Sequence, residues 1–494
     1  MTKEASATPG HAHESDREML QSSLPIEAKT LARTISDAGG RLIVVGGFVR
    51  DALRGKRSKD LDFEVYGLAG STLGEILSGL GFTPPVGRQF SVWRHTRLGF
   101  DVSLPRADGI ANDSEKRGAA LDQSIGRKRN APRDVPFAPN PRSFEAAARG
   151  RDLTLNAIAW DISRERWVDP LAGRKDLQRG ILRAADASRF AEDPLRVLRV
   201  ARLSAELGGR LDDELLTLCA AQDLSGVPVE RIAGELRRIL SITENPWRAF
   251  ERLHEMGQLA IFAPVAALAG VAQDPIWHPE GDAFLHTGLV VNEASKIAAN
   301  LPEDAAEVLM WSALCHDLGK AETTDVDSNG RVRSPGHDVA SARLAQKWLE
   351  SLKIGSRLTS RVEALCRHHL APVIFVKDGA GPKAYRRLAR KLADVDLKML
   401  DLERVARADQ LGRTTKDALT GSFDAGERFL ASARLASVER GVAEDVVRAA
   451  DWMRAGVPAG PALGRLLHRC REVQDDTGWT AADQIMALVS EGED

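Results

Sequence analysis

The sequence predicts an α+β protein, in which a small mixed-sheet head precedes an all-helical neck, a second helical domain and a helical tail. Strand-like alternation occurs only before Asp169, and helical periodicity continues from there to the C-terminus. The chain has 494 residues, which is too long for one domain. We expect a disordered N-terminus at 1–20, the head at 21–170, the neck at 171–275, the second helical domain at 276–415 and the tail at 416–494.

The head begins with a helix followed by a buried strand. Apolar spacing predicts the helix over Leu24–Ala38 and the strand over Arg41–Val45, and Gly46-Gly47 then opens the helical segment Phe48–Leu53. Further strands are predicted at Asp60–Tyr66, Gln89–Thr96 and Phe100–Leu104, with a helix at Ser71–Leu80. The segment Pro105–Pro141 has little periodicity, which predicts a long mobile insertion.

Composition excludes several classes of protein. Lysine and arginine (68) nearly balance aspartate and glutamate (70), so only local basic stripes could bind a polyanion. The four cysteines show no CxxC spacing, which argues against a zinc ribbon or a disulfide framework and favours a reducing compartment. No stretch approaches the ~18 consecutive apolar residues of a membrane span. We therefore expect a cytoplasmic protein without a membrane partner.

Paired carboxylates give the strongest chemical signal in the head. The sequence KDLDFEV (Lys59–Val65) places Asp60 and Asp62 two residues apart on a strand, so both side chains point to one face. Mg²⁺ is bound by a few carboxylates together with substrate phosphates, and two such ions can assist an in-line displacement. Asp101 on the neighbouring predicted strand is a candidate third ligand. The catalytic candidates are thus Asp60, Asp62 and Asp101, as ligands of Mg²⁺.

A structural alternative stays open for this pair: Asp60 and Asp62 can be strand-edge charges that pair with Lys59 or Arg57. The preceding GGFVRD (Gly46–Asp51) favours the metal site, because two glycines before a helix let backbone amides approach a phosphate. Arg50 could then bind a triphosphate.

The chain resembles the class II CCA-adding enzymes and their relatives, the bacterial poly(A) polymerases. Beyond the carboxylates, GRDLTLNAIAWD (Gly150–Asp161) resembles the RRD motif, VDPLAGRKDL (Val168–Leu177) the hinge, and EDPLRVLRVARLSAEL (Glu192–Leu207) the nucleotide-recognition motif. The first arginine of the RRD motif is Gly150 here, and Arg149 is a candidate substitute for it.

The resemblance implies a template-independent nucleotidyltransferase that adds CMP and AMP from CTP and ATP to the 3′ end of tRNA, with Mg²⁺. It also implies a set of nucleotide-binding residues. They are Gly46, Gly47, Arg50, Arg151, Asp152, Asn156, Asp193, Arg196, Arg199 and Arg202.

The recognition motif also has a chemical rationale. Cytosine and adenine each present an amine donor beside a ring-nitrogen acceptor, whereas uracil and guanine invert that order. Asp193 could accept from the amine while Arg196 donates to the ring nitrogen, so that U and G meet unpaired groups. The alternative is that Asp193 caps a helix beginning at Pro194, and that Arg196, Arg199 and Arg202 form a solvated stripe.

The second helical domain contains histidines and aspartates in an order that resembles an HD phosphohydrolase. The segments LHT (Leu285–Thr287) and LCHDLGK (Leu314–Lys320) precede a later aspartate. The candidate ligands of one Mn, Ni, Zn or Fe ion are His286, His316, Asp317 and Asp409. His337 and His368 could extend the site to two metals. The alternative is that these are isolated helix residues with local partners.

WHPEGDAFLHT resembles the version of this domain that some bacterial CCA-adding enzymes contain, which implies phosphatase and cyclic phosphodiesterase activity on tRNA ends. Three functions therefore compete. They are full CCA addition, a poly(A) polymerase or partial CC- or A-adding enzyme, and an HD phosphohydrolase with an RNA-binding head. The long insertion favours full CCA addition. The sequence leaves the oligomeric state open.

Overall fold

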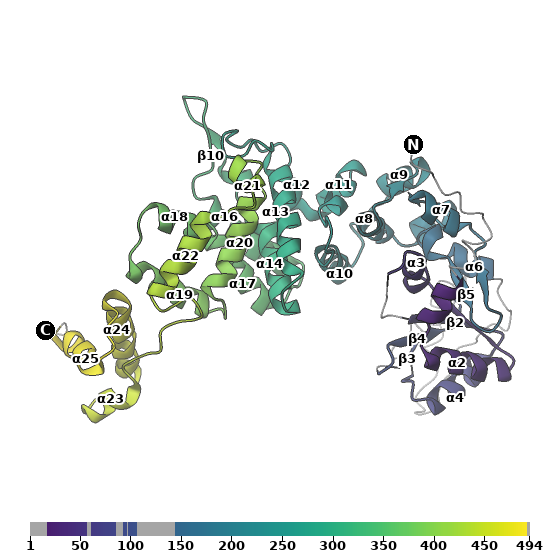
Figure 1. The fold of residues 1–494 in the computed structure, drawn as a ribbon, viewed down its shortest axis with the longest axis horizontal. Helices are drawn as coiled ribbons and strands as arrows, with labels where there is room; N and C mark the ends of the chain where they lie inside the picture. The colour runs from purple at the N-terminus through teal and green to yellow at the C-terminus, as the bar shows by residue number, and fades with distance from the viewer. Residues whose placement is uncertain (1–16, 57–60, 85–91, 96, 106–143, 492–494) are drawn as a thin grey trace, which may run out of the picture. The chain divides into compact units, whose positions relative to one another are not determined.

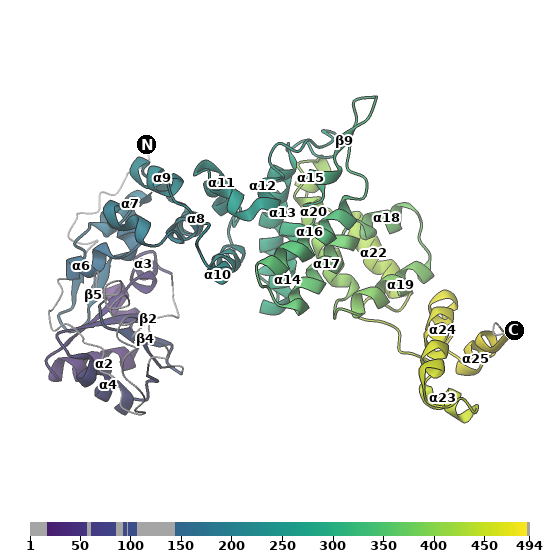
Figure 2. The same cartoon turned by 180° about the vertical axis from the view of Figure 1, so that it is seen from behind.

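The computed structural model describes residues 17–56, 61–84, 92–95, 97–105 and 144–491. They belong to two compact units. The first is Met1–Val200 with Leu207–Gln222, and the second is Ala201–Glu206 with Asp223–Asp494. Figures 1 and 2 show the elements of each unit from opposite sides. The five predicted segments and their boundaries stay predictions.

A six-stranded mixed sheet is the centre of the first unit, with the strand order β3-β4-β2-β1-β5-β6. The strands are β1 (Arg41–Val45), β2 (Leu61–Tyr66), β3 (Val92–His95), β4 (Phe100–Ser103), β5 (Ala159–Asp161) and β6 (Arg166–Val168). Strands β2 and β4 run parallel, and the other neighbours run antiparallel. The apolar run of β1 is buried, as expected of a central strand with both faces covered.

Helices and 3-10 turns surround this sheet (Figure 1). They are α2 (Ile26–Asp37), α3 (Gly47–Leu53), α4 (Gly70–Gly79), α6 (Phe144–Arg149), α7 (Gly173–Arg179), α9 (Asp213–Ala220), η1 (Thr154–Asn156) and η2 (Ala187–Glu192). Helix α2 buries Ala28, Leu31 and Ile35, whose spacing is that of one helix face. Helix α8 (Arg196–Leu207) begins in the first unit and continues into the second.

The second unit consists mainly of helices. They are α10 (Val229–Leu240), α11 (Arg248–Glu255), η3 (Leu259–Phe262), α12 (Ala263–Ala266), α13 (Ala283–Ala298), α14 (Glu303–Cys315), α15 (Lys320–Thr323), α16 (His337–Ser351), α17 (Ser356–His368), α18 (Ala371–Lys377), α19 (Pro382–Ala393), α20 (Met399–Leu411), α21 (Lys416–Leu419), α22 (Asp424–Leu435), α23 (Ala449–Arg454), α24 (Pro461–Thr477) and α25 (Ala482–Glu491). Helices α13, α14, α16, α17 and α20 pack together as a bundle (Figure 2). The predicted α+β class is confirmed.

The expectation that strands end at Asp169 was wrong. Four two-residue strands follow it, namely β7 (Ile181–Leu182), β8 (Arg210–Leu211), β9 (Asp325–Val326) and β10 (Val332–Arg333). A two-residue strand is too short to show an alternating pattern, so no sequence signal announces it. The predicted strand Gln89–Thr96 is β3, whose described part is Val92–His95. The N-terminal segment 1–16 and the insertion 106–141 lie outside the described residues, and their predicted mobility stays a prediction.

Two compositional expectations can be compared with the structure. Cys219, Cys315, Cys366 and Cys470 are all buried free thiols. Among the described helices, none has both the length and the apolar character that spanning a bilayer requires. The cytoplasmic location stays a prediction.

Candidate functional site

Two of the predicted catalytic carboxylates are neighbours on the head sheet. Asp62 of β2 pairs in register with Asp101 of β4, and paired residues of adjacent strands point to the same face. Asp62 is exposed, and the two oxygens of Asp101 accept hydrogen bonds from Arg94 Nε and Nη2 at 2.8 and 2.6 Å. Asp60, the third candidate, lies outside the described residues.

The donor set fits a hard divalent cation, because it consists of carboxylates on one sheet face. Asp62 and Asp101 are the described residues that would bind it. Arg94 was missed by the sequence analysis, because only the register of β3 against β4 reveals that it faces Asp101.

Gly46 brings the glycine turn close to these carboxylates. Its φ of 76° lies in the region that favours glycine. A Cβ atom there would lie 3.4 Å from Arg151 Nη1 and 3.8 Å from Asp62 Oδ2. Arg151 in turn donates to Glu64 Oε1 at 2.5 Å, and the hydroxyl of Tyr66 donates to Glu64 Oε2 at 2.7 Å. Glu64 and Tyr66 therefore orient Arg151 toward the turn, a role that the sequence analysis missed.

Four predicted nucleotide-binding residues form one hydrogen-bonded chain. Arg50 Nη1 donates to Asn156 Oδ1, and Asn156 Nδ2 donates to Asp152 Oδ1, both at 2.8 Å. Arg199 Nε donates to Asp152 Oδ2 at 2.8 Å. Burial raises the pKa of Asp152, but the charge of Arg199 and the bond from Asn156 outweigh it and lower the pKa to about 2. A Cβ atom on Gly47 would lie 3.7 Å from Arg50 Nη2, so Gly47 lies beside this chain.

The recognition motif begins with local bonds to the backbone. Asp193 Oδ1 accepts from the amide of Leu195 at 3.2 Å, and helix α8 begins at Arg196 rather than at Pro194. The structure therefore contains the local bond that the capping alternative for Asp193 predicts, but the helix begins two residues later than that alternative assumed. Base recognition through Asp193 and Arg196 stays a prediction.

The alternative, in which the arginines of α8 form a solvated stripe, does not fit the structure. Arg196 is buried, and its Nη1 and Nη2 donate at 2.7 Å to two backbone carbonyls. Arg199 binds Asp152, as described above. Arg202 belongs to the second compact unit and binds Glu206 and Glu235 at 2.6 and 2.9 Å. Its predicted nucleotide contact stays a prediction.

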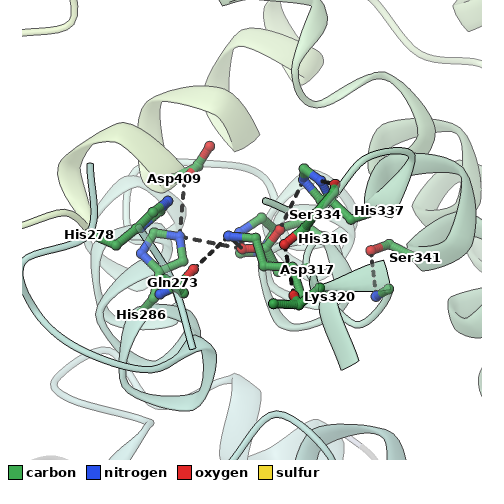
Figure 3. Close-up of polar contacts among 12 residues, drawn as sticks. Gln273, His278, His286, His316, Asp317, Lys320, Ser334, His337, Ser341 and Asp409 are labelled. Atoms are coloured by element: carbon green, nitrogen blue, oxygen red, sulfur yellow. Dashed lines mark hydrogen bonds and ion pairs between the residues drawn. The ribbon is translucent and has the colours of Figure 1, made fainter. Parts of the chain in front are cut away.

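A second cluster lies in the helical unit, where four histidines surround Asp317. Figure 3 shows three of them, His286, His316 and His337, around Asp317. Each histidine has its Nδ1 atom bound to an oxygen at 2.7–2.8 Å, in the pairs His286 with Glu280, His316 with the carbonyl of Ala313, His337 with the carbonyl of Ser334, and His369 with the carbonyl of Cys366. An oxygen partner on one ring nitrogen orients the other nitrogen as a metal ligand. The four Nε2 atoms thus face the centre of the cluster.

The ligand atoms form two adjacent groups, His286 with His316 and Asp409, and Asp317 with His337 and His369. His286 Nε2 lies 3.1 Å from Asp409 Oδ1 and 3.5 Å from Asp317 Oδ2, and His316 Nε2 lies 3.2 Å from the same Asp317 oxygen. On the other side, His337 Nε2 lies 3.4 Å from Asp317 Oδ1. The structure thus brings together all four predicted ligands, and Asp317 of the second group also lies beside the first. The alternative, in which these are isolated helix residues, does not fit this convergence.

The proposed extension of the site to His368 was wrong, because the inward residue is His369. His369 is 1% exposed and its Nε2 is 4.0 Å from Asp317 Oδ1, whereas His368 is half-buried and belongs to neither group. Two adjacent histidines at the end of α17 cannot be told apart without the helix orientation. Burial lowers the pKa of His369 to about 4, so the imidazole is neutral at pH 7, which is the form that binds metal.

Buried polar atoms show that the cluster suits a cation. Within the described residues, His316 Nε2 and Asp317 Oδ1 are buried without a hydrogen bond. Burial raises the pKa of Asp317, but the charges of His316 and Lys320 outweigh it and hold the pKa well below its usual value. The Lys320 ammonium lies 2.7 Å from Asp317 and also donates to Gln273. A divalent cation bound by imidazole and carboxylate would satisfy the atoms that have no hydrogen bond.

Glu280 belongs to this site and was missed as a functional residue. Its Oε1 lies 2.8 Å from His286 Nδ1 and 2.9 Å from His278 Nδ1, and its Oε2 accepts from the amide of Thr414 at 3.1 Å. Burial raises the pKa of Glu280, but the hydrogen bonds from His278 and His286 outweigh burial, so the pKa lies below its usual value. The available signal was WHPEGD, which places a carboxylate near the first predicted ligand.

The comparisons with known proteins match both domains of the chain. Residues 42–183 match the family model described as poly A polymerase head domain, and residues 284–405 match the HD domain. A multifunctional CCA protein of Neisseria gonorrhoeae is 33% identical over 333 residues, which are 66% of this chain and 73% of the relative. Its counterpart from Haemophilus influenzae is 34% identical over 337 residues, which are 67% and 74%.

Solved structures show the same fold. The Bacillus stearothermophilus CCA-adding enzyme in complex with CTP aligns with a TM-score of 0.60 at 22% identity, over 94% of this chain and 97% of that one. The Thermotoga maritima CCA-adding enzyme complexed with tRNA aligns with a TM-score of 0.56 at 14% identity, over 97% and 98%.

Proposed function

Because the chain belongs to the family of the multifunctional CCA proteins, we propose that it adds CMP and AMP to the 3′ end of tRNA, from CTP and ATP and without a nucleic-acid template. The observation on which this rests is the register pair Asp62 and Asp101, with Gly46 and Arg151 beside it. Related enzymes have been solved in complexes with CTP, with ATP and with tRNA. Incorporation of nucleotides into tRNA by the purified protein tests the proposal.

The family implies a divalent metal, and we assign Mg²⁺ to Asp62 and Asp101 in the head, together with Asp60. When bound, it would stabilise the charge on the attacking hydroxyl and on the pyrophosphate that leaves. The turn at Gly46 lets backbone amides approach the triphosphate. Arg151 faces the same turn and would bind phosphate oxygens, because guanidinium groups form paired hydrogen bonds with them.

Base choice is assigned to the start of α8. Asp193 would accept from the amine of cytosine or adenine, and Arg196 would donate to the ring nitrogen. Oδ1 of Asp193 already accepts from the amide of Leu195, which helps to orient the carboxylate for the base contact. Arg196 is anchored by two carbonyls, so its remaining donors would meet the base in a fixed orientation.

We propose a second activity in the HD domain, the metal-dependent hydrolysis of phosphoesters at tRNA ends. It is favoured by the convergence of His286, His316 and Asp409 beside Asp317, whose Oδ1 is buried without a hydrogen bond. A metal of the Mn, Ni, Zn or Fe group would lower the pKa of a bound water. Lys320 lies beside Asp317 and would attract the phosphate.

The test of the second activity is release of phosphate from 2′-phosphorylated or 2′,3′-cyclic ends. His316→Ala and Asp317→Ala should remove this release and leave CCA addition intact, because the two sites share no ligand. Loss of both activities in a folded variant would contradict the two-site account. If the variants still released phosphate at the wild-type rate, this activity could not be assigned to the HD domain.

The other candidate functions are less well supported. A poly(A) polymerase shares the head motifs, but the relatives matching along both halves are named CCA proteins. An HD phosphohydrolase with an RNA-binding head does not explain why Asp62 and Asp101 lie side by side where an anionic partner would bind.

The assignment of the two activities to domains is also a proposal. It places nucleotidyl transfer in 21–170 and phosphoester hydrolysis in 276–415.

A further inference from the structure

Gly150 occupies the place where the RRD motif has its first arginine, and the structure puts another guanidinium beside it. A Cβ atom on Gly150 would lie 3.8 and 3.9 Å from Nη1 and Nη2 of Arg189. Arg189 is in η2, 39 positions further along the chain, so its proximity is a result of the fold rather than of the local sequence. The space that a side chain at 150 would enter thus borders the charged end of Arg189.

Arg196 joins the two backbones. Its Nη1 donates to the carbonyl of Arg189 and its Nη2 donates to the carbonyl of Gly150, each at 2.7 Å. Because one rigid, planar guanidinium binds both carbonyls, the segments around 150 and 189 have a fixed separation. Arg196 is buried, so this bridge is protected from water. The buried bridge through Arg196 therefore fixes the position of the Arg189 backbone relative to Gly150.

The guanidinium of Arg189 is oriented by an ion pair with the exposed side chain of Glu192. Its Nε and Nη2 donate to the two oxygens of Glu192 at 2.8 and 3.1 Å. Arg189 is 23% exposed and Glu192 is 50% exposed, so an incoming anion can compete with Glu192 for the guanidinium. The pair keeps the guanidinium oriented without burying it.

Arg149, the substitute suggested by the sequence, is engaged elsewhere. Its Nη2 lies 3.0 Å from Glu145 and its Nη1 lies 3.5 Å from Asp186, and its side chain is 47% exposed. Two nitrogens of Arg189 lie within 4 Å of the Cβ position on Gly150.

We infer that Arg189 supplies the cation missing at position 150 and binds a phosphate group of the substrates. The inference rests on the proposed nucleotidyl transfer. A phosphate is the expected ligand because Gly150 adjoins Arg151, whose guanidinium faces Gly46 and Asp62. That phosphate belongs either to the incoming nucleotide or to the RNA backbone, and both offer the oxygen pair that a guanidinium binds.

The test measures KM for CTP, ATP and tRNA separately, with the full chain. Arg189→Ala should raise KM for the substrate whose phosphate it binds by about tenfold or more, the loss expected for a charge-assisted hydrogen bond. Arg149→Ala, the matched control, should leave all three values unchanged. Arg189→Gln, which can still donate to Glu192, should behave as Arg189→Ala, and it serves as the second variant if Arg189→Ala fails to fold.

Rescue gives the sharper result. Adding Gly150→Arg to Arg189→Ala should restore KM to within about threefold of the wild type, whereas adding Gly150→Ala should not. A Cβ at 150 would lie 3.3 Å from the Ala147 carbonyl, so that carbonyl must shift by a few tenths of an ångström, and the Gly150→Ala arm controls for this shift.

A higher KM for CTP and ATP identifies a nucleotide phosphate, and a higher KM for tRNA identifies an RNA phosphate. Unchanged values for Arg189→Ala, or equal rescue by alanine and arginine at 150, would overturn the inference. Failure of the proposed function is distinguishable, since the wild-type chain would then add no nucleotide.

Discussion

Asp62 and Asp101 lie side by side on the parallel strands β2 and β4, so two carboxylates that are 39 positions apart in the sequence share one face of the sheet. Arg94 binds both oxygens of Asp101 from the third strand, β3, and the exposed Asp62 faces the glycine turn. The strand pairing, rather than any loop, thus sets the geometry of the proposed catalytic centre. Sites on regular elements are positioned more accurately than sites on loops.

We predict that Asp62→Ala lowers nucleotide addition by ~10²-fold or more, because one contributor to transition-state charge stabilisation is lost. The free energy of unfolding should change by no more than about 0.5 kcal/mol, since an exposed side chain leaves no core cavity. Single-turnover addition and thermal unfolding of the same variant measure both effects. Glu75→Ala, which removes an exposed carboxylate on α4, is the control and should be fully active. Near-normal turnover of Asp62→Ala would place the active site elsewhere.

We predict that Asp152 makes a pH-dependent contribution to the free energy of unfolding. Its pKa of about 2 lies below the ordinary 3.8, so the folded state favours the ionised form. The contribution is therefore complete above pH 4 and is lost as the pH falls through about 2. Asp152→Asn should lower the free energy of unfolding by roughly 2 kcal/mol at pH 7, and the difference from wild type should shrink between pH 4 and 2. Urea unfolding across that range measures it, and a difference independent of pH would contradict the network around Asp152.

His369 and His368 form a matched pair of adjacent residues, of which only His369 reaches Asp317. We predict that His369→Ala weakens binding of a second Mn²⁺ by ~10-fold or more, since loss of even an outer partner costs that much. His368→Ala should leave the affinity unchanged. Calorimetric titration of each variant with Mn²⁺ is the measurement. Equal effects of the two substitutions would refute the two-metal arrangement.

Asp193→Ala separates base recognition from a purely structural role. If Asp193 accepts from the base amine, affinity and rate should fall for CTP and ATP together, and discrimination against UTP should fall by several powers of ten. A local bond to Leu195 alone predicts a loss of ~1 kcal/mol of stability with unchanged selectivity. Single-turnover incorporation of each of the four nucleotides, measured beside thermal unfolding, distinguishes the two. Unaltered selectivity would defeat the recognition hypothesis.

Much of the head could be predicted from its sequence, because its strands are long enough to show a pattern. The strand Arg41–Val45 was predicted with the bounds that the structure has, and Asp62 and Asp101 were placed on neighbouring strands. The two-residue strands after Asp169 could not be predicted, since no alternation exists over two residues. The position of Arg94 opposite Asp101 could not be predicted for another reason: it depends on the register of β3 against β4, which only the folded sheet fixes.

The sites show a similar limit. The motifs identified His286, His316, Asp317 and Asp409, which the structure brings together. Partners distant in sequence were missed, because a hydrogen bond between chain segments leaves no local pattern. Arg94 opposite Asp101 is one of them. Arg189 beside Gly150 is another, and there the sequence suggested the adjacent Arg149 instead.

Incubation of the purified wild-type chain with a tRNA that ends at its discriminator base tests the central claim most directly. We predict that CTP alone gives two additions, that CTP and ATP together give three and then stop, and that UTP and GTP give none. A tRNA already ending in CC should accept one residue from ATP alone. A long tail from ATP alone, or no addition from CTP, would contradict the assignment of this chain as a CCA-adding enzyme.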